Sequence, residues 1–318
     1  MWRGFCRTKP ISTSVNDDEN PRPCRRKQGL IMGVQKTKAG FFSQGFFFVL
    51  PGLLGFCVFF VFPFFLSMVY AFMDKPIGGS FVGFANFSSL FQNRAYLRGL
   101  TNTVRFISIS TPLNLLVSLG IAMLIIRLTK GREWFSLVFL VPLVIPSGAM
   151  VFFWKAFFSY EGALNGILHS FGIAKIAWLD SFLALPVMIF IFLWKNCGYN
   201  MVLFLAGLGN IPKDYYEAAW MDNASSFQAF ASITLPCLLP TTILAMIMSI
   251  INSFKIFREI YLITGNYPEE GIYTLQHFKN NMFSSLNYPR LTSATAALVI
   301  IIAVLTQFLL YLERRAAS

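Results

Sequence analysis

Six long apolar blocks constrain this chain more than any other feature of its sequence. They cover roughly residues 45–73, 103–127, 134–158, 180–207, 236–257 and 292–312. Each block is long enough to cross the hydrocarbon core of a bilayer, about 30 Å thick, as a helix. Backbone groups in lipid must be hydrogen-bonded within the protein, so long apolar blocks without alternating polarity indicate helices rather than barrel strands. The sequence therefore predicts an all-α, polytopic membrane protein with six transmembrane helices.

The composition of the chain also points to a membrane. Of the 318 residues, 56% are hydrophobic and only 13% are charged. A soluble domain of this size would carry about 25% charged residues. Water is therefore not the main solvent for most of this chain.

The net charge of +12 is distributed unevenly. Nine Lys or Arg residues lie within the first 44 positions, directly before the first apolar block. Because cationic residues favour the cytoplasmic side, the N-terminus is expected inside, and six crossings return the C-terminus to the same side. In this topology further cationic residues also lie on the cytoplasmic side, namely Arg127, Lys130, Arg132, Lys213, Arg314 and Arg315. The predicted topology is N-in and C-in, and the charge gives no reason to expect a nucleic-acid partner.

Residues 1–44 form the basic tail of this topology. Their Pro, Asn and Asp residues and few large apolar side chains predict a disordered segment near anionic membrane lipid. The basic part is too long for a cleavable signal peptide, and the apolar block after it spans the membrane. The chain therefore divides into a cytoplasmic tail, 1–44, and a transmembrane domain, 45–315.

Cysteine and histidine residues do not indicate reactive chemistry. No two cysteines share a metal-ligand or redox spacing, and the histidines lie far apart in the sequence. These residues are Cys6, Cys24, Cys57, Cys197, Cys237, His169 and His277. We predict no metal site and no catalytic residue.

The loop between the fourth and fifth blocks, 209–236, is cytoplasmic in this topology but does not have the composition of a polar turn. Pro212 suits the first turn of a helix, and Asp214 and Glu217 suit the positive end of the helix dipole. Asn223 can adopt a left-handed conformation and so end this helix.

A second short helix is predicted over 224–231, and Pro236 is expected to begin the fifth span. This helix-turn-helix would lie at the cytoplasmic surface of the bilayer, with small and apolar residues facing away from the membrane. Such a surface needs a protein partner to cover it. The alternative is an ordinary interfacial hairpin.

The same loop contains Glu217-Ala218-Ala219, Ile233 and Leu235-Pro236. These residues match in spacing the signature of the permeases of binding-protein-dependent ABC importers, which is Glu-Ala-Ala, three residues, Gly, nine residues, Ile, one residue, Leu-Pro. The chain resembles this family over roughly 45–315, and Leu205–Leu208, Ile211-Pro212 and Phe257–Pro268 resemble its carbohydrate-type branch, which includes the maltose-transporter permeases. The one departure is Asn223 in place of Gly, and Asn is the next most tolerant residue for a left-handed backbone.

The resemblance implies a type I ABC importer permease fold with a coupling helix that sits in a cleft of an ATPase subunit. The coupling residues that it implies are Glu217, Ala218, Ala219, Asp222, Asn223 and Ala224. It also implies four partners: a dimer of ATPase subunits, a second homologous permease, an extracytoplasmic solute-binding protein, and a sugar or oligosaccharide. The solute would enter the cytoplasm by alternating access across a bacterial cytoplasmic (inner) membrane.

The chain contains no Gly-x-x-x-x-Gly-Lys-Ser/Thr phosphate loop. ATP and Mg are therefore expected on the ATPase subunits, with no cofactor in this chain and no enzymatic activity of its own. One alternative is an ion-coupled secondary transporter, which requires acidic residues within spans. Another is a membrane enzyme, which requires paired carboxylates or clustered histidines. The predicted spans favour neither.

Polar residues within two of the spans are candidates for a solute path, because polar groups at membrane depth usually face a bundle interior or a wet cavity. Two stripes repeat at i, i+3, i+4 and i+7: 192, 195, 196 and 199, and 249, 252, 253 and 256. The predicted path residues are Trp194, Lys195, Asn196, Tyr199, Ser249, Asn252 and Ser253, with Asn102, Asn114 and Trp154 as further candidates. Hydrogen bonds between helices are the alternative explanation.

Lys195 needs a counter-charge, because an unpaired ammonium at mid-membrane is costly. The predicted spans offer no obvious carboxylate partner for it, since Asp180 lies at the edge of its block. One interpretation is that an acidic, uronate-containing oligosaccharide supplies the anion. The alternatives are a pair with the partner permease or contact with a water-filled cavity. The segment 259–290, outside the membrane in this topology, either meets the solute-binding protein or is a plain exposed loop.

Overall fold

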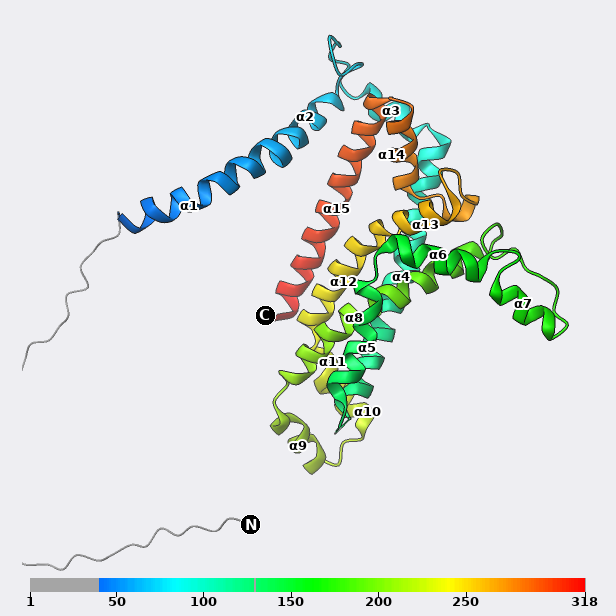
Figure 1. Ribbon diagram of the computed structural model, residues 1–318. Helices are drawn as coiled ribbons and strands as arrows, with labels where there is room; N and C mark the ends of the chain where they lie inside the picture. Colours follow the sequence, from blue (N-terminus) through cyan, green and yellow to red (C-terminus); the bar gives the residue numbers. More distant parts are fainter. Residues whose placement is uncertain (1–39, 129, 318) are drawn as a thin grey trace, which may run out of the picture. The chain divides into compact units, whose positions relative to one another are not determined.

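The computed structural model describes residues 40–128 and 130–317. Within these residues the regular structure is helical, apart from an isolated β-bridge between Met73 and Phe81. The predicted all-α fold is therefore confirmed (Figure 1). Most of the basic tail lies outside the described residues, so its disorder and the domain boundary at residue 44 stay predictions.

The chain forms two compact units, and the described part of the first is one helix, α1 (Gly40–Phe56). This helix begins before residue 45, where the first apolar block was expected to start. Phe47 and Phe48 are among its exposed apolar side chains, which suits a helix surrounded by lipid.

The second unit begins at Cys57. Its elements are a π-helical turn (Cys57–Val61), α2 (Phe62–Tyr70), α3 (Ala85–Phe91), α4 (Arg94–Ile126), α5 (Arg132–Val144), α6 (Ser147–Phe158), α7 (Ala163–Ser170), α8 (Ala184–Gly209), α9 (Lys213–Met221), α10 (Ser226–Ala229), a π-helical turn η2 (Phe230–Thr234), α11 (Leu235–Cys237), α12 (Leu239–Lys255), α13 (Phe257–Thr264), a 3₁₀ turn η3 (Glu270–Ile272), α14 (Leu275–Ser284) and α15 (Tyr288–Ala317). Helices α9 and α10 lie at one end of this unit and α3 and α14 at the other (Figure 1). Helix α15 runs from the α14 end back toward the α9 end, as an even number of crossings predicts.

Five helical stretches of the described residues are long and apolar enough to cross a membrane, and the number rises to six if a bent pair of helices counts as one span. The unbent candidates are Phe46–Tyr70, Arg94–Ile126, Ala184–Gly209, Leu239–Thr264 and Tyr288–Leu312. These six stretches match the six apolar blocks of the sequence.

The third block, 134–158, was predicted to form one transmembrane helix, whereas the structure divides it into two helices. Helices α5 and α6 meet at a bend of 92°. Pro146 disfavours helical backbone at Ile145, which is extended at φ −65° and ψ 125°. The bend therefore has a local cause in the sequence.

The fifth span differs from its predicted limits, 236–257, at both ends. It begins at Leu239 rather than at Pro236, because Pro240 has no N–H to donate to the carbonyl of Pro236. At the other end, helical structure continues through α13, and the candidate span reaches Thr264. Glu259, which was expected outside the membrane, therefore belongs to this span.

Helix α8 occupies the centre of the second unit, where it contacts α4, α5 and α12. Fully buried side chains such as Met188, Ile191 and Met201 line its length. Its approach to α5 requires glycine, because a Cβ atom at Gly198 would lie 1.9 Å from the carbonyl oxygen of Phe139. The residues of α8 are thus positioned by packing on several sides.

The segment that follows α13 is not a plain exposed loop. Its helix α14 packs against α4 and α15, with Leu275, His277 and Phe278 buried. Burial lowers the pKa of His277 to about 4. The imidazole is therefore neutral near pH 7, and its Nδ1 accepts a hydrogen bond of 3.1 Å from the backbone N–H of Thr274.

Candidate functional site

The predicted coupling loop folds as a hairpin of α9 and α10. Helix α9 begins directly after Pro212, whose backbone is at φ −58° and ψ 135°, and Asp214 lies in its first turn. Glu217 is exposed on this helix. The first helix of the predicted helix-turn-helix is thus confirmed.

The turn of the hairpin also has its predicted conformation. Asn223 is left-handed, with φ 56°. The N–H of Ala224 donates to the carbonyl of Ala219 at 2.9 Å, and the N–H of Asn223 donates to the carbonyl of Trp220 at 3.0 Å. These bonds satisfy carbonyl groups at the end of α9, which is the role of a left-handed residue after a helix.

The second helix starts two residues later than predicted, at Ser226 rather than at Ala224. Ser225 and Gln228 form a capping box: the N–H of Gln228 donates to Ser225 Oγ at 3.3 Å, and the N–H of Ser225 donates to Gln228 Oε1 at 2.8 Å. A serine with a glutamine three residues later is the sequence signal for such a start.

The hairpin exposes a set of large side chains. Tyr215, Trp220, Met221 and Phe227 are 54%, 65%, 84% and 77% exposed. Tyr216 instead turns inward, where its hydroxyl lies 2.8 Å from Thr234 Oγ1. An exposed apolar surface of this kind marks a site of contact with another protein or with a membrane.

The six predicted coupling residues lie together on α9 and in the turn after it. Glu217, Ala218, Asp222 and Asn223 are exposed, whereas Ala219 and Ala224 are half-buried. Their arrangement agrees with the prediction, and their role in coupling stays a prediction.

A second cluster, which we call the polar centre, lies inside the helix bundle. It consists of Asn114, Ser147, Lys195, Asn200, Ser249 and Glu259. Three of these residues, Lys195, Ser249 and Asn114, were candidates for the solute path.

One half of the polar centre joins α4, α8 and α12. The side-chain amides of Asn114 and Asn200 donate to Ser249 Oγ at 3.1 and 2.6 Å. All three residues are buried. Ser249 therefore bonds between helices in this structure, which agrees with the alternative explanation for the polar stripes. Asn200 was missed, although it lies one helical turn after Asn196 in the sequence.

The other half joins α6, α8 and α13. Lys195 Nζ forms an ion pair with the carboxylate of Glu259. Ser147, the first residue of α6, accepts from Lys195 Nζ at 2.9 Å and donates to Glu259 Oε1 at 3.0 Å. The two charged side chains are only 18% and 4% exposed.

This ion pair corrects the expectation that Lys195 has no carboxylate partner in the spans. The expectation was wrong because the fifth span was ended at residue 257, whereas the helical span continues past Glu259. Lys195 is neutralised within the chain, so it no longer gives a reason to expect an acidic solute.

Other predicted path residues form local contacts. Asn196 and Ser253 donate to the carbonyls of Phe192 and Ile250, each within one turn of its own helix, at 2.9 and 2.6 Å. Asn252 Oδ1 accepts from Lys255 Nζ at 3.0 Å. Trp194 packs edge-on against Trp154, with ring centroids 5.2 Å apart, and Tyr199 is half-buried. The structure does not bring the seven predicted residues into one cavity.

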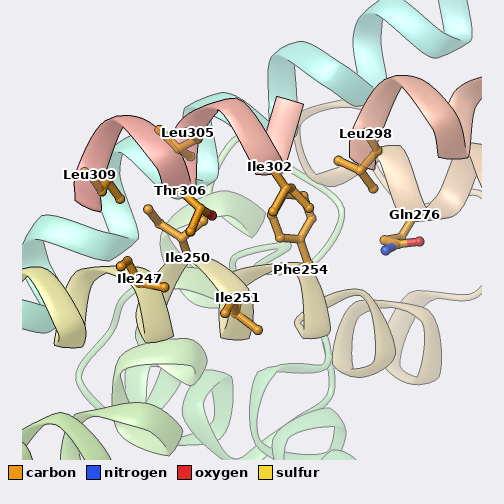
Figure 2. Close-up of a pocket in the computed structure, with 10 residues that line it drawn as sticks. All are labelled: Ile247, Ile250, Ile251, Phe254, Gln276, Leu298, Ile302, Leu305, Thr306 and Leu309. Atoms are coloured by element: carbon orange, nitrogen blue, oxygen red, sulfur yellow. The ribbon is translucent and has the colours of Figure 1, made fainter. Parts of the chain in front are cut away.

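Figure 2 shows a cavity of about 170 Å³ whose lining side chains come mainly from α12 and α15. Gln276 and Thr306 are the only polar residues among them, and Ile250, Phe254 and Ile302 are typical of the rest. None of the seven predicted path residues lines it. With so few polar groups it does not suit a sugar, whose hydroxyls require hydrogen-bond partners.

Comparison with protein families gives one match over most of the second unit. Residues 115–318 match the family described as binding-protein-dependent transport system inner membrane component. Among curated proteins, the chain is 31% identical over 278 residues to the trehalose/maltose transport system permease protein MalF of Thermococcus litoralis, covering 85% of this chain and 92% of that protein. It is 32% identical over 227 residues to the sulfoquinovosyl glycerol transport system permease protein SmoG of Agrobacterium fabrum, covering 68% and 72%.

A solved structure has the same fold. It is the crystal structure of a bacterial ABC transporter involved in the import of the acidic polysaccharide alginate, and one of its chains aligns with a TM-score of 0.75 and 22% sequence identity. The alignment covers 86% of this chain and 96% of the other.

Proposed function

Because this chain belongs to the family of binding-protein-dependent transport system inner membrane components, we propose that it is a permease subunit of an ATP-driven importer of a sugar or oligosaccharide. The family places it in the inner membrane and excludes the ion-coupled secondary transporter considered as an alternative. Two of the relatives are permease proteins of transport systems for trehalose and maltose and for sulfoquinovosyl glycerol, which supports a glycoside as the solute.

The observation that carries this proposal is the α9–α10 hairpin. It lies at one end of the bundle, and Trp220, Met221 and Phe227 are uncovered on its surface. The chain has no phosphate loop of its own, so the energy for transport must come from another subunit. An ATPase subunit that receives this hairpin would cover the apolar side chains and transmit its movement to α8 and α12.

The remaining partners follow from the same arrangement. A second permease of similar fold would complete the translocation path beside this chain. A solute-binding protein would deliver the sugar at the opposite end, where α3 and α14 lie. The solute would then pass as the two permeases alternate between outward-open and inward-open states.

Reconstitution tests the proposal. The complex of this chain with its second permease and its ATPase subunits is placed in liposomes, with the binding protein outside and radiolabelled sugars added. We expect sugar accumulation that requires both internal ATP and the binding protein. Accumulation that follows an imposed Na⁺ or H⁺ gradient without ATP would contradict the proposal.

A further inference from the structure

A groove of about 680 Å³ lies between α4 and α8, outside the polar centre. Aliphatic side chains such as Ile109, Leu113 and Leu193 line most of its length. Phe182 and Phe190 add two exposed aromatic rings, 82% and 50% exposed. The groove is therefore mainly apolar, with aromatic surfaces of the kind that pack against the apolar face of a sugar ring.

Two charged residues, Arg105 and Glu269, also line the groove. Glu269 comes from the segment before η3, beside Gly271. This segment leads into α14, which lies at the end of the bundle proposed to meet the binding protein. The groove therefore combines a mainly apolar lining with two charged residues.

Arg105 is not neutralised by an ion pair in the part of the chain that the structure describes. Among residues 40–128 and 130–317 it forms no ion pair and no hydrogen bond, whereas Lys195 pairs with Glu259 and Arg98 with Glu270. It lies inside the candidate span Arg94–Ile126. A guanidinium at such a position is costly unless it faces water or an anion. Its five donors in a fixed fork match a carboxylate, sulfonate or phosphate group.

Glu269 adds a hydrogen-bond acceptor to the groove. Its Oε2 accepts a hydrogen bond of 2.6 Å from the N–H of Gly271, which orients the carboxylate beside the groove that both residues line. A fixed carboxylate accepts hydrogen bonds from hydroxyl groups. Arg105, Glu269 and the two rings therefore suit a hydroxylated ring that carries one acid group.

We propose that this groove is the entry site for the solute and that Arg105 selects glycosides bearing an acid group. The inference rests on the proposed import of a glycoside and names its chemical class. It replaces Lys195, which Glu259 neutralises, with Arg105 as the residue that meets the acid. The sulfoquinovosyl glycerol of one relative and the alginate of the structural neighbour are solutes of this class.

The experiment compares uptake of matched probes by the reconstituted complex with its own binding protein. The probes are uronate-, sulfonate- and phosphate-bearing glycosides, each paired with its uncharged counterpart. The variants are Arg105→Gln, Arg105→Lys and the control Arg94→Gln, which removes an exposed arginine of the same helix that does not line the groove. Initial uptake rates are measured for each pair.

We expect Arg105→Gln to reduce uptake of the acidic probe about tenfold or more, because a charge-assisted hydrogen bond is lost, with less than about a twofold change for its neutral counterpart. Arg105→Lys should retain part of the acidic uptake, and Arg94→Gln should match wild type. The inference is wrong if the wild type takes up only neutral probes, or if Arg105→Gln lowers both members of a pair alike, as it would if Arg105 bound lipid or the partner permease. If no probe of either kind is taken up, the proposed sugar import fails as well.

Discussion

The α9–α10 hairpin and the polar centre differ in where their stabilising contacts come from. In the hairpin, backbone bonds join residues such as Ala219 and Ala224 that are close in sequence, while Trp220 and Met221 remain exposed. In the polar centre, Lys195 and Glu259 are 64 positions apart and are both largely buried. The hairpin can therefore form from hydrogen bonds between residues close in the sequence, and it leaves apolar side chains exposed to a partner. The polar centre instead joins helices that are distant in the sequence.

The largest expected effect is at the hairpin. Glu217→Lys should abolish solute-stimulated ATP hydrolysis, because it reverses a charge on the surface proposed to contact the ATPase. Insertion and thermal stability of the permease should stay unchanged, since Glu217 is exposed. Glu133→Lys, an exposed acid in the first turn of α5, is the control and should hydrolyse ATP like wild type. Wild-type hydrolysis by purified Glu217→Lys complex would remove the coupling role.

The second prediction concerns the ion pair of the polar centre. Lys195→Met or Glu259→Leu alone should lower the free energy of unfolding by about 3–5 kcal/mol, because either leaves a buried charge without its partner. The double variant should recover much of this loss. Denaturant unfolding of the purified complex measures these effects, and Glu270→Leu in the exposed Arg98 pair should change little. Purely additive effects of the two single variants would show that the pair does not act as a unit.

A third, smaller effect is expected at Ser249. Ser249→Ala should cost about 1–3 kcal/mol, since the amides of Asn114 and Asn200 lose their buried acceptor. Ser253→Ala on the same helix is the matched control, because Ser253 bonds only to a carbonyl of its own helix among the described residues. Thermal unfolding distinguishes them, and equal shifts for both variants would contradict the role given to Ser249 between helices.

The smallest effect is expected at the turn of the hairpin. Asn223→Gly should be tolerated or slightly activating, since glycine adopts a φ of 56° without steric cost. Asn223→Val should reduce transport, because a β-branched residue resists this conformation. Transport rates of the two variants in the same liposome assay test the point, and identical rates would show that the turn does not need a left-handed residue.

Much of the fold could be predicted because its signals are local. The apolar blocks identified the helices that can cross a membrane, and Pro212 and Asn223 marked the start and end of α9. Some of the wrong predictions have causes that can be identified in the sequence. The bend before α6 follows from Pro146, and the start of α10 follows from the capping pair Ser225 and Gln228.

The polar stripes on α8 and α12 could not be assigned in the same way. Their spacing shows that the residues share a helix face, but it does not say what that face meets. Asn196 and Ser253 bond within their own helices, while Ser249 bonds to two others. A single sequence gives all three the same pattern.

The sequence by itself determined the helices that can cross a membrane and the α9–α10 hairpin, because apolar length and turn chemistry act over a few residues to about 20 residues. Only the tertiary structure decided that Lys195 meets Glu259, that Ser249 lies against Asn114, 135 positions away, and that Arg105 forms no ion pair among the described residues. These outcomes depend on how the helices are rotated and packed against one another. That packing is the sum of many weak contacts between distant parts of the chain, and none of these contacts can be recognised from a short stretch of sequence.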